Sequence, residues 1–154
     1  MDFKIRRAIL SDVPAIQQLV NAYADQGKML HRSLDELCSN IRDYTVADRD
    51  GVLLGCAATE IFGENLAEVK SIAVSPTAQR MGVGRALVEK CAEDARALGI
   101  GRLFCLTFQP EFFEAAGFKR VEREALPKRI WAECVCCPGY PDCGELAMVM
   151  ELGE

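Results

Sequence analysis

Residues 71–87 read SIAVSPTAQRMGVGRAL, and this stretch decides the fold. Its apolar start predicts a strand, Ser75-Pro76 predicts a turn, and the residues from Val83 onward predict a helix. Gly82 and Gly84 allow the backbone to approach a ligand closely and to turn several N–H groups toward it. Because these N–H groups lie at the N-terminus of the helix, the stretch predicts a phosphate-binding site. A surface loop whose glycines only turn the chain is the alternative.

The charge around this loop differs from that of the whole chain. Residues 69–88 carry Lys70, Arg80 and Arg85 and no acid, which gives +3 within a chain of 154 residues whose formal net charge is −5. The local excess indicates one small anionic ligand, whereas the overall acidity argues against nucleic acid and an anionic membrane as partners. The sequence contains no Walker motif, and neither GVGRAL (82–87) nor GIGRLF (99–104) has the third glycine of the dinucleotide fingerprint.

The stretches on either side predict a mixed sheet. Apolar runs bounded by turn residues predict strands at 3–9, 44–48, 52–61, 68–74, 102–107, 118–122 and 146–152. Helical periodicity and capping residues predict helices beginning at Ser11-Asp12-Val13-Pro14, after Ser33, after Gly82 and at Pro110. Early antiparallel strands followed by a β-α-β unit imply an α/β (mixed α+β) sheet with helices on both faces.

Length and composition favour a single domain over residues 1–154. Half of the residues are hydrophobic (50%) and 27% are charged, which is an ordinary globular balance. No apolar run approaches the about 18 residues that cross a bilayer. The start, MDFKIRRAIL, lacks the apolar core of a signal peptide, so we expect a cytoplasmic protein. Residues 124–144 are interpreted as a Cys-rich insert within the domain.

The eight cysteines fall into two groups. Four stand singly in apolar surroundings and are expected to be reduced, buried hydrophobes: Cys38, Cys56, Cys91 and Cys105. In the insert, Cys134 and Cys137 form a C-x-x-C pair, and Cys143 follows six residues later. Thiolates at this spacing can bind one structural zinc ion, with Cys136, Asp142 or water as the fourth ligand. Free thiols in an ordered insert are the alternative, and a redox pair fits less well because the context is not thioredoxin-like.

Two motifs carry a family resemblance. Residues 79–84, QRMGVG, fit the signature Q/R-x-x-G-x-G/A, and residues 112–118, FFEAAGF, resemble the pattern F-Y-E-x-x-G-F. With both motifs in this order, the chain resembles the GNAT family of acetyl-CoA-dependent N-acetyltransferases. Segments 27–33, 55–58, 103–107 and 126–131 further resemble stand-alone bacterial amino-acid N-acetyltransferases of the N-acetylglutamate synthase type.

This resemblance implies a GNAT-like fold with a splayed central sheet. It also implies an acetyl-transfer reaction. The acetyl group of acetyl-CoA would pass to the α-amino group of L-glutamate, the first step of arginine biosynthesis, by direct attack of the amine. It also implies an acetyl-CoA site in which the strand holds the pantetheine and the loop holds the pyrophosphate. The implied residues are Ile72, Ala73, Val74, Gln79, Arg80, Met81, Gly82, Val83, Gly84 and Arg85.

Direct attack needs a neutral amine, so a base must accept a proton from the ammonium group. Glu68 is the first candidate, because it begins the strand that leads into the loop and matches the position that some family members use. Glu60 is the second candidate, and a solvated carboxylate at the strand edge is the alternative for Glu68. Phe113 stands where the family often has a tyrosine acid, so either the CoA thiolate leaves unprotonated or Tyr140 or Thr107 supplies the proton.

Glutamate carries two carboxylates, so its pocket should present two cationic or N–H groups. The resemblance implies that Arg32 and the backbone near Leu30 hold the amino acid, with Thr107 as a further candidate contact. Lys70, Lys128 and Arg129 are candidates for the second cation. A solvated side chain is the alternative for Arg32.

Two other functions stay open. The acceptor could be another amino acid, a small amine or a protein N-terminus. The chain could also be a non-catalytic acetyl-CoA-binding sensor, for which Phe113 in place of a tyrosine is the best support. The oligomeric state is open as well, a homodimer included.

Overall fold

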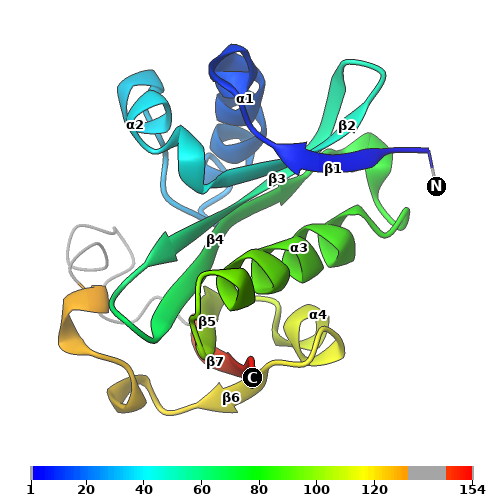
Figure 1. Cartoon of the computed structure of the whole chain (residues 1–154). Helices are drawn as coiled ribbons and strands as arrows, with labels where there is room; N and C mark the ends of the chain where they lie inside the picture. Colours follow the sequence, from blue (N-terminus) through cyan, green and yellow to red (C-terminus); the bar gives the residue numbers. More distant parts are fainter. Residues whose placement is uncertain (1, 132–144, 154) are drawn as a thin grey trace.

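The computed structural model describes residues 2–131 and 145–153, without the side chains of Arg129 and Trp131. In this part the chain forms one mixed sheet with the strand order β1-β2-β3-β4-β5-β7-β6 (Figure 1). The pair β4–β5 is parallel and the other neighbours are antiparallel. The strands are β1 (Lys4–Arg7), β2 (Tyr44–Arg49), β3 (Val52–Ile61), β4 (Leu66–Val74), β5 (Arg102–Thr107), β6 (Lys119–Val121) and β7 (Leu146–Glu151).

The helices cover both faces of the sheet, as predicted (Figure 1). They are α1 (Val13–Ala24), α2 (Leu34–Ser39), α3 (Val83–Ala97) and α4 (Pro110–Ala115). Neighbouring residues of β3 divide between the two layers: Cys56 packs with Ile16 of α1, and Ala57 belongs to the cluster that contains Leu87 of α3. This alternation follows from the two-residue period of a strand and gives the sheet a hydrophobic core on each face.

Local signals set most helix ends. Ser33 caps α2 reciprocally, since the Glu36 N–H donates to Ser33 Oγ and the Ser33 N–H donates to Glu36 Oε1, both at 3.1 Å. Gly99, at φ +89°, follows the end of α3 in the left-handed conformation expected of a stop residue. The start of α1 differs from the prediction: a 3-10 turn (Leu10–Asp12) precedes it, and no side chain caps it, because the carboxylate of Asp12 binds Arg6 instead.

A bulge in β4 changes which side chains face which layer. Cys56 pairs with Ala73 and Ala58 pairs with Lys70, so an extra residue of β4 lies opposite Ala57. Ser71 lies in this bulge and has a left-handed backbone conformation, with φ +53°. As a result Val69 before the bulge and Val74 after it both pack against the α3 side, while Lys70 and Ala73 face the α1 side.

The sheet opens between β4 and β5. These strands pair only from Leu66 to Glu68 on β4 and from Arg102 to Phe104 on β5, and then diverge (Figure 1). Beyond the closed end, the Gly101 N–H donates to Asn65 Oδ1 at 2.7 Å, which ties the β3–β4 turn to the start of β5. The expected splayed GNAT-like sheet is thereby confirmed.

Other expectations have mixed outcomes. Cys56, Cys91 and Cys105 are buried as expected, and burial raises the pKa of the Cys56 thiol to about 12, so it stays protonated. Cys38 is exposed, because α2 turns the neighbouring Leu37 inward instead, so the expectation of burial was wrong there. β7, which comes last in the sequence, lies between β5 and β6.

The zinc prediction falls outside the described residues, where Cys134, Cys137 and Cys143 all lie, together with Cys136, Tyr140 and Asp142. Within 2–131 and 145–153, no group of three His, Cys, Asp or Glu side chains could hold a metal ion. The helices in these ranges are also too short or too polar to cross a membrane.

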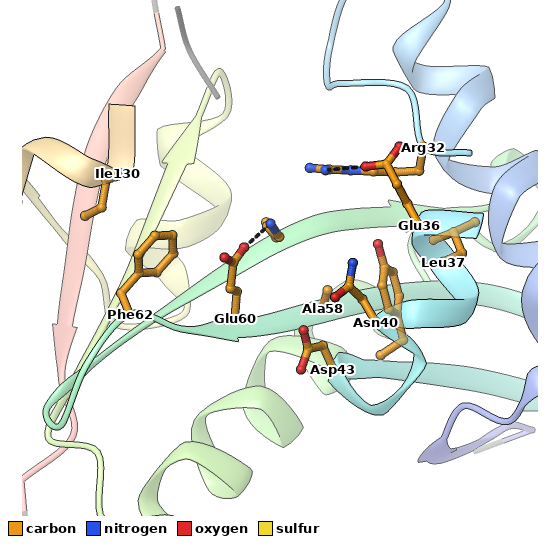
Figure 2. Close-up of a pocket in the computed structure, with 11 residues that line it drawn as sticks. Arg32, Glu36, Leu37, Asn40, Asp43, Ala58, Glu60, Phe62 and Ile130 are labelled. Atoms are coloured by element: carbon orange, nitrogen blue, oxygen red, sulfur yellow. Dashed lines mark hydrogen bonds and ion pairs between the residues drawn. The ribbon is translucent and has the colours of Figure 1, made fainter. Parts of the chain in front are cut away.

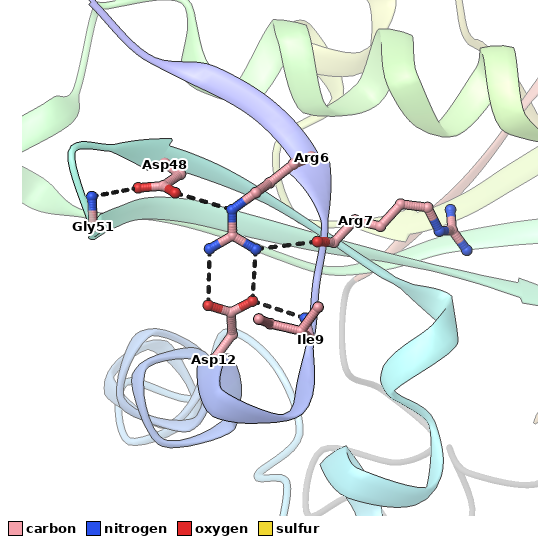
Figure 3. Close-up of polar contacts among 6 residues, drawn as sticks. All are labelled: Arg6, Arg7, Ile9, Asp12, Asp48 and Gly51. Carbon is pink, nitrogen blue, oxygen red and sulfur yellow. Dashed lines mark hydrogen bonds and ion pairs between the residues drawn. The ribbon is translucent and has the colours of Figure 1, made fainter.

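An arginine network joins the N-terminal strand to the first helix and the first hairpin (Figure 3). Arg6 donates to both carboxylate oxygens of Asp12 at 2.8 and 3.0 Å, and its Nε donates to Asp48 at 2.9 Å. Asp12 also accepts the Ile9 N–H, and Asp48 accepts the Gly51 N–H, each at 2.8 Å. The guanidinium therefore links three backbone segments through two nearly buried carboxylates.

This network predicts how stability depends on pH. Arg6 holds the pKa of Asp12 and of Asp48 below the ordinary carboxyl value. Both groups therefore contribute stability above about pH 4, and this contribution is lost as the pH falls through their lowered values. Arg6→Met should destabilise the fold at pH 7 by about 1–3 kcal/mol and flatten the loss of stability on acidification. Urea unfolding at pH 7 and at lower pH values measures both.

Arg7→Met is the matched control, since the Arg7 side chain is 57% exposed and pairs with Asp94 at the surface. It should cost less than about 1 kcal/mol and leave the pH slope unchanged. Equal pH slopes for the wild type and Arg6→Met would show that the network does not carry the acid sensitivity.

Candidate functional site

A pocket of about 320 Å³ opens on the α1–α2 side of the sheet (Figure 2). It lies between α2 and the short 3-10 turn Lys128–Trp131, with β3 and β4 as its floor. Its volume is in the range of small-molecule sites, about 300–1,000 Å³. The lining combines apolar and charged side chains: Arg32, Glu36, Leu37, Asn40, Asp43, Tyr44, Ala58, Glu60, Phe62, Lys70 and Ile130.

Two of the predicted substrate cations face this one pocket. Arg32 reaches it from the segment before α2, with its side chain only 12% exposed and its Nη1 3.6 Å from Glu36 Oε2. Lys70 reaches it from β4 and forms an ion pair with Glu60 of β3 (Figure 2). The structure therefore brings Arg32 and Lys70 together, although the Lys70 ammonium already binds a carboxylate.

One carboxyl group of the pocket lies in a partly dry environment. Asp43 is half-buried, and its pKa is raised, first by burial and then by the negative charge of Glu60, against the opposing effect of Lys70. Burial also raises the pKa of the Tyr44 hydroxyl, which therefore stays protonated. The pocket thus offers one carboxyl group that takes up a proton more readily than it would in water.

Glu68, the predicted base, lies at the fork of the splayed sheet. It is buried, it is the register partner of Glu60 on β3, and its pairing with Phe104 is the last between β4 and β5. Since it precedes Lys70 by two residues on the same strand, both side chains project on the same face. Glu68 is not one of the residues that line the pocket, whereas Glu60, the second candidate, is.

The open edge of β4 carries backbone groups directed into the gap. Val74 lies opposite Gly55 of β3, and the following Ser75 N–H donates to the Leu54 carbonyl at 2.8 Å. In this antiparallel register the N–H and C=O of Val74 itself point away from β3, toward β5. The Val74 carbonyl accepts the Tyr23 hydroxyl at 2.6 Å, and the Val74 N–H faces the gap. A ligand carbonyl can therefore bind there as a strand would.

The loop before α3 has the backbone of an anion site. Gly82, at φ +82°, is the N-cap residue of α3 and contributes no capping side chain, and the first turn of the helix contains no acid. The N–H groups at this helix start can therefore bind an anion. A side chain at Gly82 would meet nothing within 4 Å, so the space beside these groups is open. Arg80 and Arg85 are exposed on the same loop and first turn.

Gly84 and Gln79 have structural partners that the motif did not reveal. A Cβ on Gly84 would lie 3.1 Å from the ring of Phe112, so this glycine lets α3 pack against α4. The Gln79 amide donates to the Val74 carbonyl at 3.2 Å and to the Tyr23 hydroxyl at 3.3 Å. Both side-chain contacts hold the end of β4 and the loop together.

The remaining predicted residues are placed as follows. Ile72 packs toward α3 and Ala73 toward α1, Met81 packs partly against the α3 core, and Val83 is buried there. Thr107 is buried at the end of β5, where its Oγ1 accepts the Gln109 N–H at 2.8 Å. Leu30 is half-buried in the segment that leads to Arg32. Lys128 is exposed and does not line the pocket, and the side chain of Arg129 lies outside the described part.

Phe113 is a packing residue, as interpreted from the sequence. It is buried and makes edge-to-face contacts with Phe112 and Phe118, with ring centroids 5.0 and 5.2 Å apart.

Of the eleven lining residues, sequence reasoning named Arg32, Glu60 and Lys70 as site candidates and missed the other eight: Glu36, Leu37, Asn40, Asp43, Tyr44, Ala58, Phe62 and Ile130. Asn40 precedes a 3-10 turn (Ile41–Asp43) and Asp43 ends it, and the sequence contains no ligand-binding pattern at this turn. Phe62 and Ile130 are far apart in the sequence, and only the fold brings Phe62 against the apolar cluster that contains Ile130.

Residues 14–118 match the acetyltransferase (GNAT) family. An uncharacterized N-acetyltransferase of Chlorobaculum tepidum is 39% identical over 151 residues, which cover 98% of this chain and 97% of that protein. The amino-acid acetyltransferase of Mycobacterium tuberculosis is 37% identical over 140 residues, which cover 88% of this chain and 78% of that protein.

A solved structure extends the comparison to bound ligands. N-acetylglutamate synthase from Neisseria gonorrhoeae, complexed with coenzyme A and N-acetyl-glutamate, matches with a TM-score of 0.90 and 32% identity. The match covers 99% of this chain and 35% of that one, so this chain corresponds to about a third of the synthase.

Proposed function

This chain belongs to the acetyltransferase (GNAT) family, and on that premise we propose that it transfers the acetyl group of acetyl-CoA to the α-amino group of L-glutamate. We further propose that this reaction is the first step of arginine biosynthesis. The observation that supports the acceptor is the single pocket that Arg32 and Lys70 both line, beside the fork of the splayed sheet. A glutamate bound there would have a cation for each carboxylate.

The residues present fit acetyl-CoA. The N–H groups at the start of α3, with Arg80 and Arg85 nearby, suit a pyrophosphate. The Val74 N–H, directed into the gap beside β4, suits a pantetheine amide carbonyl. When bound, acetyl-CoA supplies the thioester carbonyl that the amine attacks. An N–H of β4 can stabilise the negative charge that develops on that carbonyl oxygen.

Glu68 is proposed to accept the proton of the acceptor ammonium. A thioester lying along the open edge of β4 would end near the fork, where Glu68 lies. Glu60 lines the pocket but is paired with Lys70, so it remains the second candidate. No proton comes from Phe113, and a CoA thiol with a pKa of about 8.5 can leave as the thiolate.

The cofactor prediction compares two glycines at opposite ends of α3. Gly82 and Gly99 both have positive φ, and a side chain at either meets nothing within 4 Å. Gly82→Trp should weaken CoA binding by at least about tenfold, because the indole covers the N–H groups that hold the pyrophosphate. Gly99→Trp carries similar backbone strain and should leave CoA affinity unchanged. Titration calorimetry measures both, and equal affinities would remove the basis for this loop as the CoA site.

The base prediction concerns Glu68→Gln, which keeps the shape of the side chain. It should lower kcat by about a hundredfold while the KM for acetyl-CoA barely changes, since only the proton acceptor is lost. Glu60→Gln, measured in parallel by thiol release, should retain most of the activity. If Glu60→Gln loses kcat and Glu68→Gln does not, the base is Glu60.

The acceptor prediction concerns Arg32. Arg32→Ala should raise the KM for glutamate by an amount equivalent to about 1.5–3 kcal/mol, with little change in the KM for acetyl-CoA. Arg32→Lys should recover only part, because an ammonium lacks the planar guanidinium fork. Glutamine should be a much poorer acceptor, since it lacks the second carboxylate. Equal turnover of glutamine, or an unchanged glutamate KM in Arg32→Ala, would mean that the acceptor is not glutamate.

A further inference from the structure

Arg32 has to be aimed into the pocket from a segment without regular structure. It lies between the end of α1 at Ala24 and the start of α2 at Leu34, yet its side chain is only 12% exposed and lines the pocket. An arginine side chain loses considerable rotamer freedom when it is held in one place, so its backbone must be fixed by other residues if the guanidinium is to be pre-organised.

One face of α1 supplies this support. The Arg32 N–H donates to Asn21 Oδ1 at 3.0 Å, and Asn21 Nδ2 donates back to the Arg32 carbonyl at 3.3 Å. Gln17 Nε2 donates to the same carbonyl at 3.2 Å. Gln17 and Asn21 are four residues apart, so they lie one above the other on the helix. The Asn21 amide thus binds both backbone groups of Arg32, as a neighbouring strand would.

The other side of Arg32 is fixed as well. The next residue, Ser33, is the N-cap of α2, and its N–H and hydroxyl are both engaged by Glu36. The peptide group before Arg32 is therefore anchored to α1, and the one after it is anchored to both α1 and α2. What remains adjustable is the side chain, which extends into the pocket.

We propose that Asn21 is a positioning residue for the acceptor: it sets the affinity for the acceptor carboxylate through Arg32, without touching the substrate. This inference rests on the proposed function, in which Arg32 binds that carboxylate. Because Asn21 acts on the acceptor side alone, its loss affects the KM for the acceptor and leaves acetyl-CoA binding unchanged.

The test is steady-state kinetics on the full chain with glutamate and acetyl-CoA. Asn21→Ala should raise the KM for glutamate by about tenfold, the scale of one or two lost hydrogen bonds, with kcat and the KM for acetyl-CoA within about twofold. Asn21→Asp keeps the acceptor for the Arg32 N–H but loses the donor to its carbonyl, so it should have an intermediate effect. Gln26→Ala is the control, since that exposed amide lies in the turn after α1 and donates to the Ala22 carbonyl, away from Arg32.

The double variant Asn21→Ala/Arg32→Ala separates positioning from general stability. Since Asn21 acts through Arg32, the double variant should bind glutamate no more weakly than Arg32→Ala alone. Fully additive effects, or a kcat and acetyl-CoA KM that change together with the glutamate KM, would overturn the positioning role. If Arg32→Ala raises the glutamate KM but neither Asn21→Ala nor Asn21→Asp does, the inference fails and the proposed function stands. If Arg32→Ala has no effect, both fail.

Discussion

The opening of the sheet after the Glu68–Phe104 pair is the constraint on which the rest of the site depends. Two strands that diverge leave backbone groups along β4 without a neighbour, and a buried N–H or C=O without a partner is costly. The Val74 carbonyl has two side-chain partners instead, because it accepts hydrogen bonds from the Tyr23 hydroxyl and the Gln79 amide. The Val74 N–H, in contrast, faces the gap. The divergence of β4 from β5 thus leaves an edge of β4 at which an extended ligand can bind.

The bulge at Ser71 determines which side chains of β4 face the α1 side of the sheet and which face the α3 side. Before the bulge, Glu68 and Lys70 project on the α1 side, where the pocket lies, and Val69 contacts the α3 core. After it, Val74 returns to the α3 side, although a regular strand would have sent it to the other. One strand can therefore place charged side chains at the pocket and then pack firmly on α3, close to the loop that precedes this helix. The left-handed Ser71 is the strained position that makes both possible.

The sequence predicted what neighbouring residues encode and missed what only the tertiary fold creates. The helix start after Ser33 and the strands at 44–48 and 52–61 were predicted because each depends on residues within a few positions. The same reasoning assigned both glycines of the loop to the ligand, yet Gly84 is required by Phe112, which lies in the second motif. The ion pair of Glu60 with Lys70 depends on the register between β3 and β4. Ile130 reaches the pocket because a segment distant in the sequence packs back beside the sheet. Neither arrangement can be predicted from a local sequence pattern.

The charges of the pocket explain why its two cations are not equivalent. Lys70 is held by Glu60, so a substrate carboxylate that binds Lys70 must compete with a carboxylate already in contact. Arg32 faces weaker competition, because Glu36 Oε2 is 3.6 Å from it and the Glu36 side chain is half exposed to water, which screens its charge. Asp43, whose pKa is raised by burial and by Glu60, can reduce the repulsion by taking up a proton. Under the proposed function, an acceptor with one carboxylate would therefore have its most favourable partner in Arg32. A second carboxylate would gain only the difference between its own attraction to Lys70 and that of Glu60.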